Sequence, residues 1–338
     1  MAKALIALSG GVDSAVAAYL MKQQGYDCIG AMMQLLDGQS TDDAKAVCDN
    51  LGIPFYAFDM RDEFKNTIID DFVTSFENGE TPNPCVLCNK KLKFGALFQK
   101  MQELDCDVLV TGHYARIEET SGEFRLKKAE NTAKDQSYFL YSLDPNVLKH
   151  VRFPLGGYTK DQIREIAENI GFSVARKKDS QDICFVPDGD YVKVITDLSK
   201  KHYKKGNFVD LAGSVLGTHQ GIINYTVGQR KGLGIAFGKP MYVYRKNAET
   251  NEVTLCDDNE LFTDTLEAKN INLLTNISLN NLKCKARIRY RHEEQPATVT
   301  QNGDTVTVKF DTPQRAITPG QSVVFFDGDI VLGGGIIK

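Results

Sequence analysis

The stretch Ser9-Gly10-Gly11-Val12-Asp13-Ser14 decides the fold of this chain, because it joins an apolar run at residues 4–8 to a helical pattern at residues 14–24. Adjacent glycines allow positive φ and a close approach of the backbone to a ligand. Serine hydroxyls and the N–H groups at the positive end of a helix can then donate to an anion. The order of strand, glycine turn and helix therefore predicts a phosphate-binding loop.

Asp13 adds a condition to this prediction, because its charge would oppose a bare phosphate. We expect it to act through Mg²⁺ that bridges a polyphosphate. The GxxxxGK[ST] loop of the kinase type does not occur in the chain. The structural alternative is an ordinary strand–turn–helix junction with a Ser/Asp cap, which the six residues in this context disfavour.

Strand and helix patterns alternate around and beyond this loop. Further strands are expected at residues 28–33, 53–58 and 107–111, and further helices at residues 44–51, 64–76, 92–104 and 159–170. Repeated βαβ units with apolar strands are typical of a parallel sheet that helices cover on both faces, so the fold class is α/β.

The pattern changes near residue 200, where glycines multiply and β-rich runs replace helices. Asn302-Gly303 separates two such runs, at residues 297–300 and 305–310, which predicts a hairpin with a type I′ turn. The glycine-rich stretch at residues 217–238 fits no pattern. A small β domain or barrel should close the chain. We place the domains at residues 1–195, 196–265 and 266–338.

Composition narrows the class of protein. Hydrophobic residues make up 42% and charged residues 25% of the 338 residues, as in ordinary soluble proteins. No apolar run has the length of a membrane span, and the N-terminus lacks the pattern of a signal peptide, so a cytoplasmic protein is expected. The net charge of −4 does not indicate nucleic-acid binding, but basic clusters occur at residues 90–93, 176–178 and 200–205. Each cluster could equally be a solvated face.

Eight cysteines fall into two groups. Because the cytosol is reducing, each is expected to be core filler, a metal ligand or a reactive group. The isolated ones, expected in the core, are Cys28, Cys48, Cys106, Cys256 and Cys284. Cys85, Cys88 and Cys184 lie among prolines or cations instead. Cys88 is expected near a helix N-terminus beside Lys90 and Lys91, which would lower the pKa of its thiol.

Four interpretations of Cys85, Cys88 and Cys184 compete. A structural zinc site would usually need a second cysteine pair. A thioredoxin-like dithiol would leave the phosphate loop without a role. An iron–sulfur site held by all three cysteines would keep one iron open for sulfide. In the fourth interpretation, sulfur transfer, Cys184 carries a persulfide and Cys88 is the resolving thiol. Oxygen-to-sulfur exchange needs both a nucleotide and a reactive thiol pair.

Residues 9–14 resemble the PP-loop of the ATP pyrophosphatases, which cleave ATP between the α- and β-phosphates and adenylate a substrate oxygen. Over almost its whole length the chain resembles one family among them, the bacterial tRNA-uridine 2-sulfurtransferases (MnmA, tRNA-specific 2-thiouridylases). Besides residues 9–14 and 81–90, the resemblance is carried by Thr111-Gly112-His113-Tyr114, Lys134-Asp135-Gln136-Ser137-Tyr138-Phe139-Leu140, Lys178-Asp179-Ser180, Gly228-Gln229-Arg230-Lys231-Gly232-Leu233-Gly234 and Thr318-Pro319-Gly320-Gln321.

This resemblance implies a fold and a set of site residues. The fold is a Rossmann-like PP-loop catalytic domain, a small central tRNA-binding domain and a C-terminal β-barrel. ATP binding is implied for Ala7, Leu8, Ser9, Gly10, Gly11, Val12, Asp13, Ser14, Met33 and Gly112. Asn83, Pro84 and Cys85 would face the target base, and tRNA contacts are implied for His113, Lys134, Asp135, Gln136, Arg289, Tyr290 and Gln321. Cys88 matches the nucleophile and Cys184 the persulfide cysteine.

The implied reaction is 2-thiolation of the wobble uridine of tRNA. ATP with Mg²⁺ adenylates the flipped base, the Cys184 persulfide delivers sulfur, and a Cys88–Cys184 disulfide results. A cysteine desulfurase or a sulfur-relay protein would donate the sulfur. The alternatives are an amide- or guanidine-forming ATP pyrophosphatase and an RNA-binding protein with a relic nucleotide site.

Two further features bear on this interpretation. Cys85 stands where many members of the family carry aspartate, so a proposed acid/base carboxylate is missing. Either that role is dispensable, or Cys85 supplies it, or Cys85 helps to hold a [4Fe–4S] cluster. In the C-terminal region, five cations alternate with other residues from Lys283 to Arg291, and a strand there would place them on one face for phosphate contact. The structural alternative is a solvated edge strand.

Overall fold

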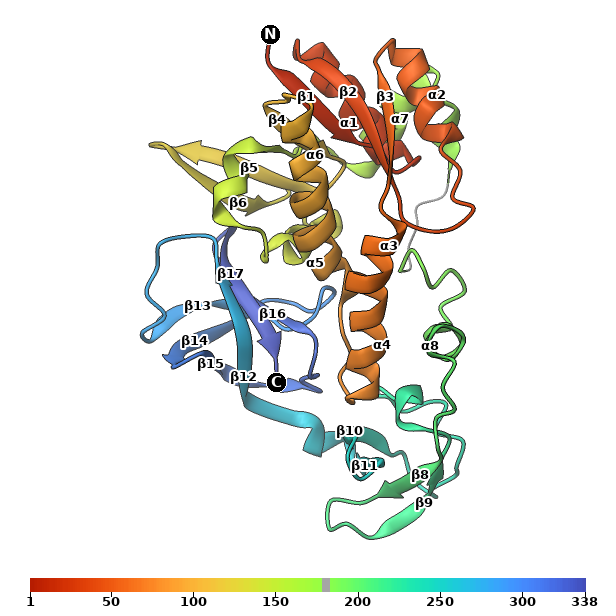
Figure 1. Ribbon diagram of the computed structural model, residues 1–338. Helices are drawn as coiled ribbons and strands as arrows, with labels where there is room; N and C mark the ends of the chain where they lie inside the picture. The colour runs from red at the N-terminus through yellow and green to blue at the C-terminus, as the bar shows by residue number, and fades with distance from the viewer. Residues whose placement is uncertain (178–182) are drawn as a thin grey trace.

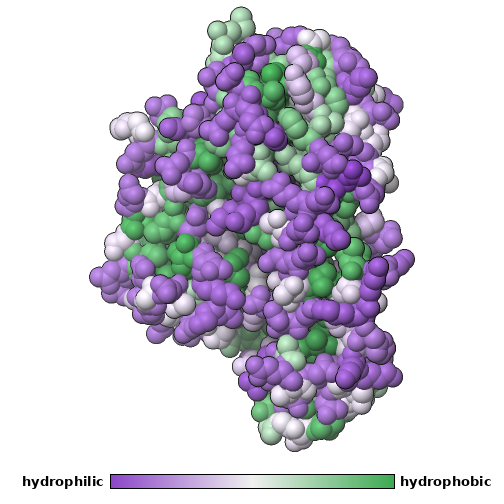
Figure 2. Space-filling view, in the orientation of Figure 1, coloured by the Kyte–Doolittle hydropathy of each residue, from purple (hydrophilic) through white to green (hydrophobic). Residues whose placement is uncertain are grey.

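The computed structural model describes residues 1–177 and 183–338. An α/β domain lies at one end of the molecule, a small β domain at the other end, and a β-barrel beside the middle (Figure 1). Figure 2 shows a mostly hydrophilic face on which hydrophobic residues lie in separate patches. None of the helices in the described ranges has the length and apolarity needed to cross a membrane.

A parallel sheet with the order β3-β2-β1-β4-β7 forms the centre of the N-terminal domain. Its strands are β1 (Lys3–Ala7), β2 (Asp27–Gln34), β3 (Phe55–Asp59), β4 (Val108–Thr111) and β7 (Val151–Arg152). Successive residues of a strand point to opposite faces. Accordingly, Ile6 and Leu5 are both fully buried but belong to two different hydrophobic cores, one on each face of the sheet. The predicted parallel sheet with helices on both faces is confirmed.

The helices that cover the sheet agree with the sequence pattern in most places. They are α1 (Val12–Gln23), α2 (Asp42–Leu51) and α7 (Lys160–Ile170) on one face. A second set continues through π-helical turns: α3 (Arg61–Phe64), η1 (Lys65–Ile69), α4 (Asp70–Glu77), and then α5 (Pro84–Cys88), η2 (Asn89–Ala96), α6 (Leu97–Glu103). A capping box of Thr159 and Gln162 starts α7, and left-handed Gly171 ends it.

One predicted helix boundary is wrong. The helix expected at residues 92–104 begins at Pro84, because Asn83 takes the N-cap position and proline is well suited to the first helical position. The proline-rich segment that precedes the two cysteines is therefore shorter than expected, and both cysteines are helical.

The central domain contains a sheet with the order β10-β11-β8-β9. Helix α8 (Tyr191–Ser199) precedes it, and its strands are β8 (Gly206–Val209), β9 (Val215–His219), β10 (Tyr242–Asn247) and β11 (Glu252–Cys256). Phe208 and Val243 of this sheet share one core with Phe72 and Phe76 of α4. After β9, the glycine-rich stretch forms loops around a short 3-10 turn, η7 (Ile222–Asn224).

A closed barrel ends the chain, because β12 pairs with β15 on one side and with β17 on the other. Its strands are β12 (Phe262–Leu273), β13 (Leu282–Arg287), β14 (Gln295–Asn302), β15 (Thr305–Arg315), β16 (Ser322–Asp327) and β17 (Ile330–Ile337). The hairpin of β14 and β15 is confirmed. The predicted type I′ turn is wrong, because Asn302 pairs with Thr305 and only Gly303 of the two turn residues has positive φ.

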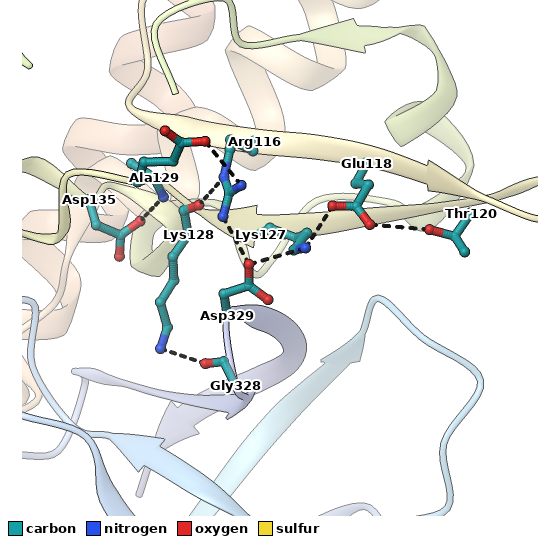
Figure 3. Close-up of polar contacts among 10 residues, drawn as sticks. Arg116, Glu118, Thr120, Lys127, Lys128, Ala129, Asp135, Gly328 and Asp329 are labelled. Atoms are coloured by element: carbon teal, nitrogen blue, oxygen red, sulfur yellow. Dashed lines mark hydrogen bonds and ion pairs between the residues drawn. The ribbon is translucent and has the colours of Figure 1, made fainter. Parts of the chain in front are cut away.

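A hairpin that the sequence did not predict connects the N-terminal domain to the barrel. It consists of β5 (Ala115–Thr120) and β6 (Glu123–Lys128), and β6 pairs with β17. Around this pairing, Arg116 and Lys127 reach Asp329 at 2.9 and 3.1 Å, and Lys128 donates to the Gly328 carbonyl (Figure 3). Short 3-10 helices connect other elements at Thr132–Lys134, Ser137–Leu140, Pro145–His150, Ser173–Arg176 and Asp258–Leu261.

Candidate active site

The predicted phosphate loop lies between the carboxyl end of β1 and the start of α1. Gly10 adopts φ of +70°, and Gly11 is the N-cap, so no side chain caps the helix. The N–H groups of the first helical turn are therefore available to an anion. The Ser14 hydroxyl donates to the Gly11 carbonyl and accepts from the Ser9 N–H, both at 3.1 Å, which fixes the curve of the loop.

The other residues predicted to bind ATP lie at the same edge of the sheet. Strand β1 runs between β2 and β4, so the strand order reverses here, where ligands of open α/β sheets bind. Ala7 pairs with Ala31 and Thr111 and ends β1; Met33 lies near the end of β2, and Gly112 follows β4. Leu8 is buried, and its N–H donates to the Ala31 carbonyl, which continues the strand pairing by one residue.

Gly112 packs directly against the start of α1. A Cβ atom at this position would lie 2.8 Å from the Ser14 nitrogen and 2.9 Å from the Asp13 carbonyl carbon. Both are backbone atoms, which cannot swing aside as a flexible side chain can. Glycine is therefore needed at position 112 for packing, whatever its role toward a nucleotide.

Asp13 has protein partners in this structure. The Lys160 ammonium lies 2.8 Å from both carboxylate oxygens, and the Tyr114 hydroxyl donates at 2.8 Å. A carboxylate neutralised in this way is a poor ligand for a hard cation. The residues present therefore do not fit a Mg²⁺ ion held by Asp13, and we assign Mg²⁺ no protein ligand.

A second lysine, Lys177, stands at the mouth of the loop. Its Nζ atom donates to the Gly10 carbonyl at 3.1 Å and to Asp43 at 2.7 Å. Lys160 and Lys177 thus bring positive charge to the loop, although neither was predicted. Both come from distant segments; Lys177 belongs to the basic cluster at residues 176–178, but that pattern did not predict a place for it at this loop.

Cys85, Cys88 and Cys184 are neighbours in the structure. Cys85 and Cys88 lie in the first turns of the helix that Pro84 opens, and Cys184 lies in a turn of a separate segment. The three thiols are near enough that a thiolate at Cys184 or Cys85 raises the pKa of Cys88. The structure thus brings together Cys88 and Cys184, the two cysteines that the sulfur-transfer interpretation needs and that are distant in sequence.

The predicted low pKa of Cys88 is wrong for this arrangement. Burial raises the pKa of the Cys88 thiol to about 11, and the positive charge of Lys93 acts in the opposite direction and lowers it. Lys90 and Lys91, the predicted cations, are exposed to solvent. Burial also raises the pKa of Cys85 and Cys184, because protein surrounds both thiols although each touches solvent.

Lys93 is the cation at the centre of this group. Its charge lowers the pKa of all three thiols, and its Nζ atom lies 3.5 Å from Nε2 of His113. Burial and the charge of Lys93 hold the pKa of His113 well below its ordinary value, so the ring is neutral. With Lys93 donating to Nε2, the ring proton belongs on Nδ1, which lies 2.7 Å from the Thr111 hydroxyl.

The π-helical turns of η2 bring Lys93 to the cysteines. In a regular α-helix, residues five apart point about 140° away from each other. Backbone bonds in a π-helix join residues five apart, so Lys93 lies one wide turn after Cys88. Such turns often mark functional sites.

Within residues 1–177 and 183–338, no group of three or more His, Cys, Asp or Glu side chains is arranged to hold a metal ion. Cys28, Cys48, Cys106 and Cys256 are buried as predicted, and Cys284 is half-buried. The motif Lys178-Asp179-Ser180 lies outside the described residues.

Comparison with known proteins identifies the family. Family models match residues 2–188 (tRNA methyl transferase HUP domain), 195–257 (tRNA methyl transferase PRC-barrel domain) and 263–337 (aminomethyltransferase beta-barrel domain). The tRNA-specific 2-thiouridylase MnmA of Clostridioides difficile is 48% identical, with 99% of this chain and 98% of the relative covered. That of Lachnoclostridium phytofermentans is 46% identical, with 100% and 99% covered. The chain belongs to the tRNA-specific 2-thiouridylase (MnmA) family.

Among solved structures, a 4-thiouridine synthetase in complex with RNA and ATP matches with 17% identity and a TM-score of 0.37. The match covers 58% of this chain and 50% of the other, a likeness too weak to support a conclusion.

The tRNA contacts predicted from the 2-thiouridylase family are only partly available to a ligand. Asp135 is 3% exposed, and its carboxylate accepts from the N–H groups of Ala129 and Ser137 and from the Ser137 hydroxyl. The Asp135 carboxylate is thus bonded within the chain in this structure, and its contact with tRNA stays a prediction. Gln136 accepts from the Tyr114 N–H, and Lys134 is half-buried.

The predicted face of five cations is also wrong. Strand β13 ends at Arg287, which turns to Glu294 at 2.8 Å and Asp135 at 3.6 Å. Arg289 donates to the Ala316 carbonyl and the Thr318 hydroxyl inside the barrel loop. Only Lys283 and Lys285 of the strand are exposed, so the alternation predicted from the sequence stops where the strand stops.

Tyr290 and Gln321 have partners within the chain as well. The Tyr290 ring packs with its centroid 4.4 Å from that of Phe139. The Phe139 carbonyl accepts from the side chain of Asn89 in the continuous helix of α5, η2 and α6, called the cysteine helix below. The Gln321 amide donates to the Thr81 carbonyl at 2.7 Å. Several residues predicted to contact tRNA thus lie around the cysteine helix.

Proposed function

We propose that this chain is an ATP-dependent tRNA-uridine 2-sulfurtransferase that replaces the C2 oxygen of the wobble uridine with sulfur. The convergence of Cys88 and Cys184 carries the proposal, because a phosphate loop alone would fit any ATP pyrophosphatase. Relatives that match over the full length and are named 2-thiouridylases support the same activity.

Activation of the oxygen is the first step. Residues 9–14 hold the phosphates of ATP, with Gly112 behind the loop and Lys177 at its mouth. The uridine O2 attacks the α-phosphorus, the bond to the β-phosphate oxygen breaks, and pyrophosphate leaves. The base now carries AMP on O2, and its C2 is electrophilic.

Sulfur transfer is the second step, and Cys184 enters it as a persulfide. The terminal sulfur attacks C2 and AMP leaves with the former base oxygen. The Cys88 thiolate then attacks the Cys184 sulfur and breaks the persulfide bond, so the transferred sulfur stays on C2. A Cys88–Cys184 disulfide remains, and an external thiol must reduce it before the next turnover.

Several parts of this proposal remain predictions. They are tRNA contacts by Asn83, Pro84, Cys85, His113, Lys134, Asp135, Gln136, Arg289 and Tyr290, a persulfide-donating protein partner, a cytoplasmic location, the domain boundaries, and a [4Fe–4S] cluster on Cys85, Cys88 and Cys184. A cluster would show as iron and acid-labile sulfide in anaerobically purified protein, and Cys85→Asp would remove it if Cys85 is a ligand.

Mass analysis of tRNA nucleosides after incubation with the chain, ATP and a persulfide source tests the proposed activity. We expect Cys184→Ser and Cys88→Ser to abolish thiolation and leave the affinity for tRNA near normal. Cys284→Ser, a half-buried thiol of the barrel, is the matched control and should thiolate normally. Thiolation retained in Cys184→Ser would reject the persulfide role.

Release of pyrophosphate separates the rival functions. The proposed enzyme should release it only with tRNA present. An amide-forming relative would release it with a small acceptor alone, and a non-catalytic RNA-binding protein would release none.

A further inference from the structure

The segment that leads into the cysteine helix is held by the barrel. The Thr81 N–H donates to the Pro319 carbonyl at 2.8 Å, and the Gln321 side chain donates to the Thr81 carbonyl at 2.7 Å. Both backbone polar groups of Thr81 are thus bonded to one loop of the barrel. Thr81 stands four residues before Cys85 and belongs to a different domain from its partners.

The barrel loop is shaped for this contact. Gly320 has φ of +88°, and a Cβ atom there would lie 2.8 Å from the Thr81 nitrogen. The backbone of Gln321 is itself fixed, because its carbonyl accepts from the Ile337 N–H at 2.8 Å and Gly320 donates to the Ile337 carbonyl at 2.9 Å. The Gln321 amide therefore projects from a rigid base on β17.

Neighbouring contacts hold the same segment from two other elements. Glu80 pairs with Lys269 of β12 at 3.1 Å, and its carbonyl accepts from Lys246 of β10 at 3.3 Å. These contacts fix the chain just before Thr81. Among the described residues, several side chains bond to this segment from other domains. Of the bonds made by barrel side chains, the one from Gln321 lies nearest to the cysteines.

We propose that Gln321 is a positioning residue, which fixes Thr81 and thereby sets the start of the helix that carries Cys85 and Cys88. The amide is committed to Thr81, so its role differs from the tRNA contact that the family resemblance implied. The barrel thus influences the position of the reactive cysteines through the segment of residues 81–84. The consequence for thiolation rests on the proposed function, whereas the consequence for the cysteine geometry does not.

The chain offers a matched control. Gln314 of β15 also donates its amide to a backbone carbonyl, that of Thr312 at 2.7 Å, but within the barrel's own strand. Gln321→Met and Gln314→Met make the same chemical change and remove the same kind of bond. Only the first change should reach the cysteines.

The experiment measures two rates and one affinity. The first is the rate at which diamide, a two-electron oxidant that takes up two protons, converts the Cys88 and Cys184 thiols to a disulfide. The second is the single-turnover rate of tRNA thiolation beside the Kd for tRNA. For Gln321→Met we expect both rates to fall roughly three- to tenfold, as for one lost hydrogen bond, and the Kd to stay within about twofold. Gln314→Met should change neither rate.

Three results would overturn the proposal. They are an unchanged disulfide rate in Gln321→Met, a tenfold weaker Kd for tRNA with unchanged rates, and equal losses in both variants. Gln321→Glu, which replaces the donor by an acceptor, serves if Gln321→Met does not fold. Should the wild-type chain fail to thiolate tRNA, the proposed function fails while the disulfide rate still decides the role of Gln321.

Discussion

Cys88 has to act as a thiolate in the proposed sulfur transfer, yet it lies where burial raises its pKa to about 11. Desolvation disfavours the charged form of any thiol, and a nearby cation offsets that effect. Among the residues that the structure describes, Lys93 is the cation that acts on Cys88, Cys85 and Cys184 together. The reactivity of the site therefore depends on one lysine that faces three sulfurs.

Replacement of Lys93 should make Cys88 less reactive. Without the cation the thiolate is less favourable, so the pKa of Cys88 rises further and less thiolate is present at any pH below that pKa. We expect alkylation of Cys88 by iodoacetamide, followed by peptide mass in a Cys85→Ser background, to slow about tenfold at pH 9 in Lys93→Met.

Lys93→Arg keeps the charge and should retain the wild-type pH profile. Lys91→Met removes an exposed lysine of the same helix and should have no effect. Equal slowing in Lys91→Met and Lys93→Met would reject the assignment of Lys93.

Sequence alone could predict residues whose chemistry is marked by their neighbours along the chain. Ser9 to Ser14 form a local motif, and the Cys85–Cys88 pair has its own unusual surroundings. Lys160 and Lys177 could not be predicted, because they reach the loop from residues more than a hundred positions away. The prediction of a low pKa for Cys88 was wrong for a similar reason, since the burial that raises this pKa is a property of the folded chain and not of the neighbouring sequence.

At the scale of elements, Gly11 and Gly112 serve the junction of β1, β4 and α1 in different ways. A Cβ atom on Gly11 would meet only the Ser9 hydroxyl at 3.5 Å, an ordinary contact. A Cβ atom on Gly112 would collide with the backbone of α1. Packing alone thus requires glycine at position 112, whereas position 11 has room for a methyl group unless a ligand occupies it.

Alanine at each position separates packing from ligand binding. We expect Gly112→Ala to lower the free energy of unfolding by about 2 kcal/mol, as overpacking does. Gly11→Ala should unfold at the wild-type temperature but bind ATP at least tenfold more weakly, because its methyl group would take the space of the phosphates. Thermal unfolding and equilibrium dialysis with ATP measure the two effects. Normal ATP binding by Gly11→Ala would contradict the assigned phosphate site.

The arrangement of the whole molecule depends on pairs that sequence patterns do not reveal. Periodicity predicted the parallel sheet and the terminal barrel, since each strand or helix carries its own pattern. It missed the hairpin β5–β6, and the pairing of Lys127 with Ile330 joins positions about two hundred residues apart. The barrel that this pairing joins to the N-terminal domain also carries Gln321, which meets Thr81 four residues before Cys85.

A mostly buried charge cluster at this junction gives the last prediction. Glu294 of the barrel, 10% exposed, pairs with Lys128 of β6 at 2.7 Å and with Arg287 at 2.8 Å. Both cations also lie over the Phe326 ring. Glu294→Ala leaves them partly unpaired, and we expect a loss of about 3 kcal/mol in the free energy of unfolding.

Asp329→Asn is the control, because it removes an ion-pair partner at the same junction that is 44% exposed. It should lower the free energy of unfolding by less than about 1 kcal/mol, since solvent screens this pair. Urea unfolding measures both changes, and equal losses in the two variants would show that burial does not set the strength of this junction.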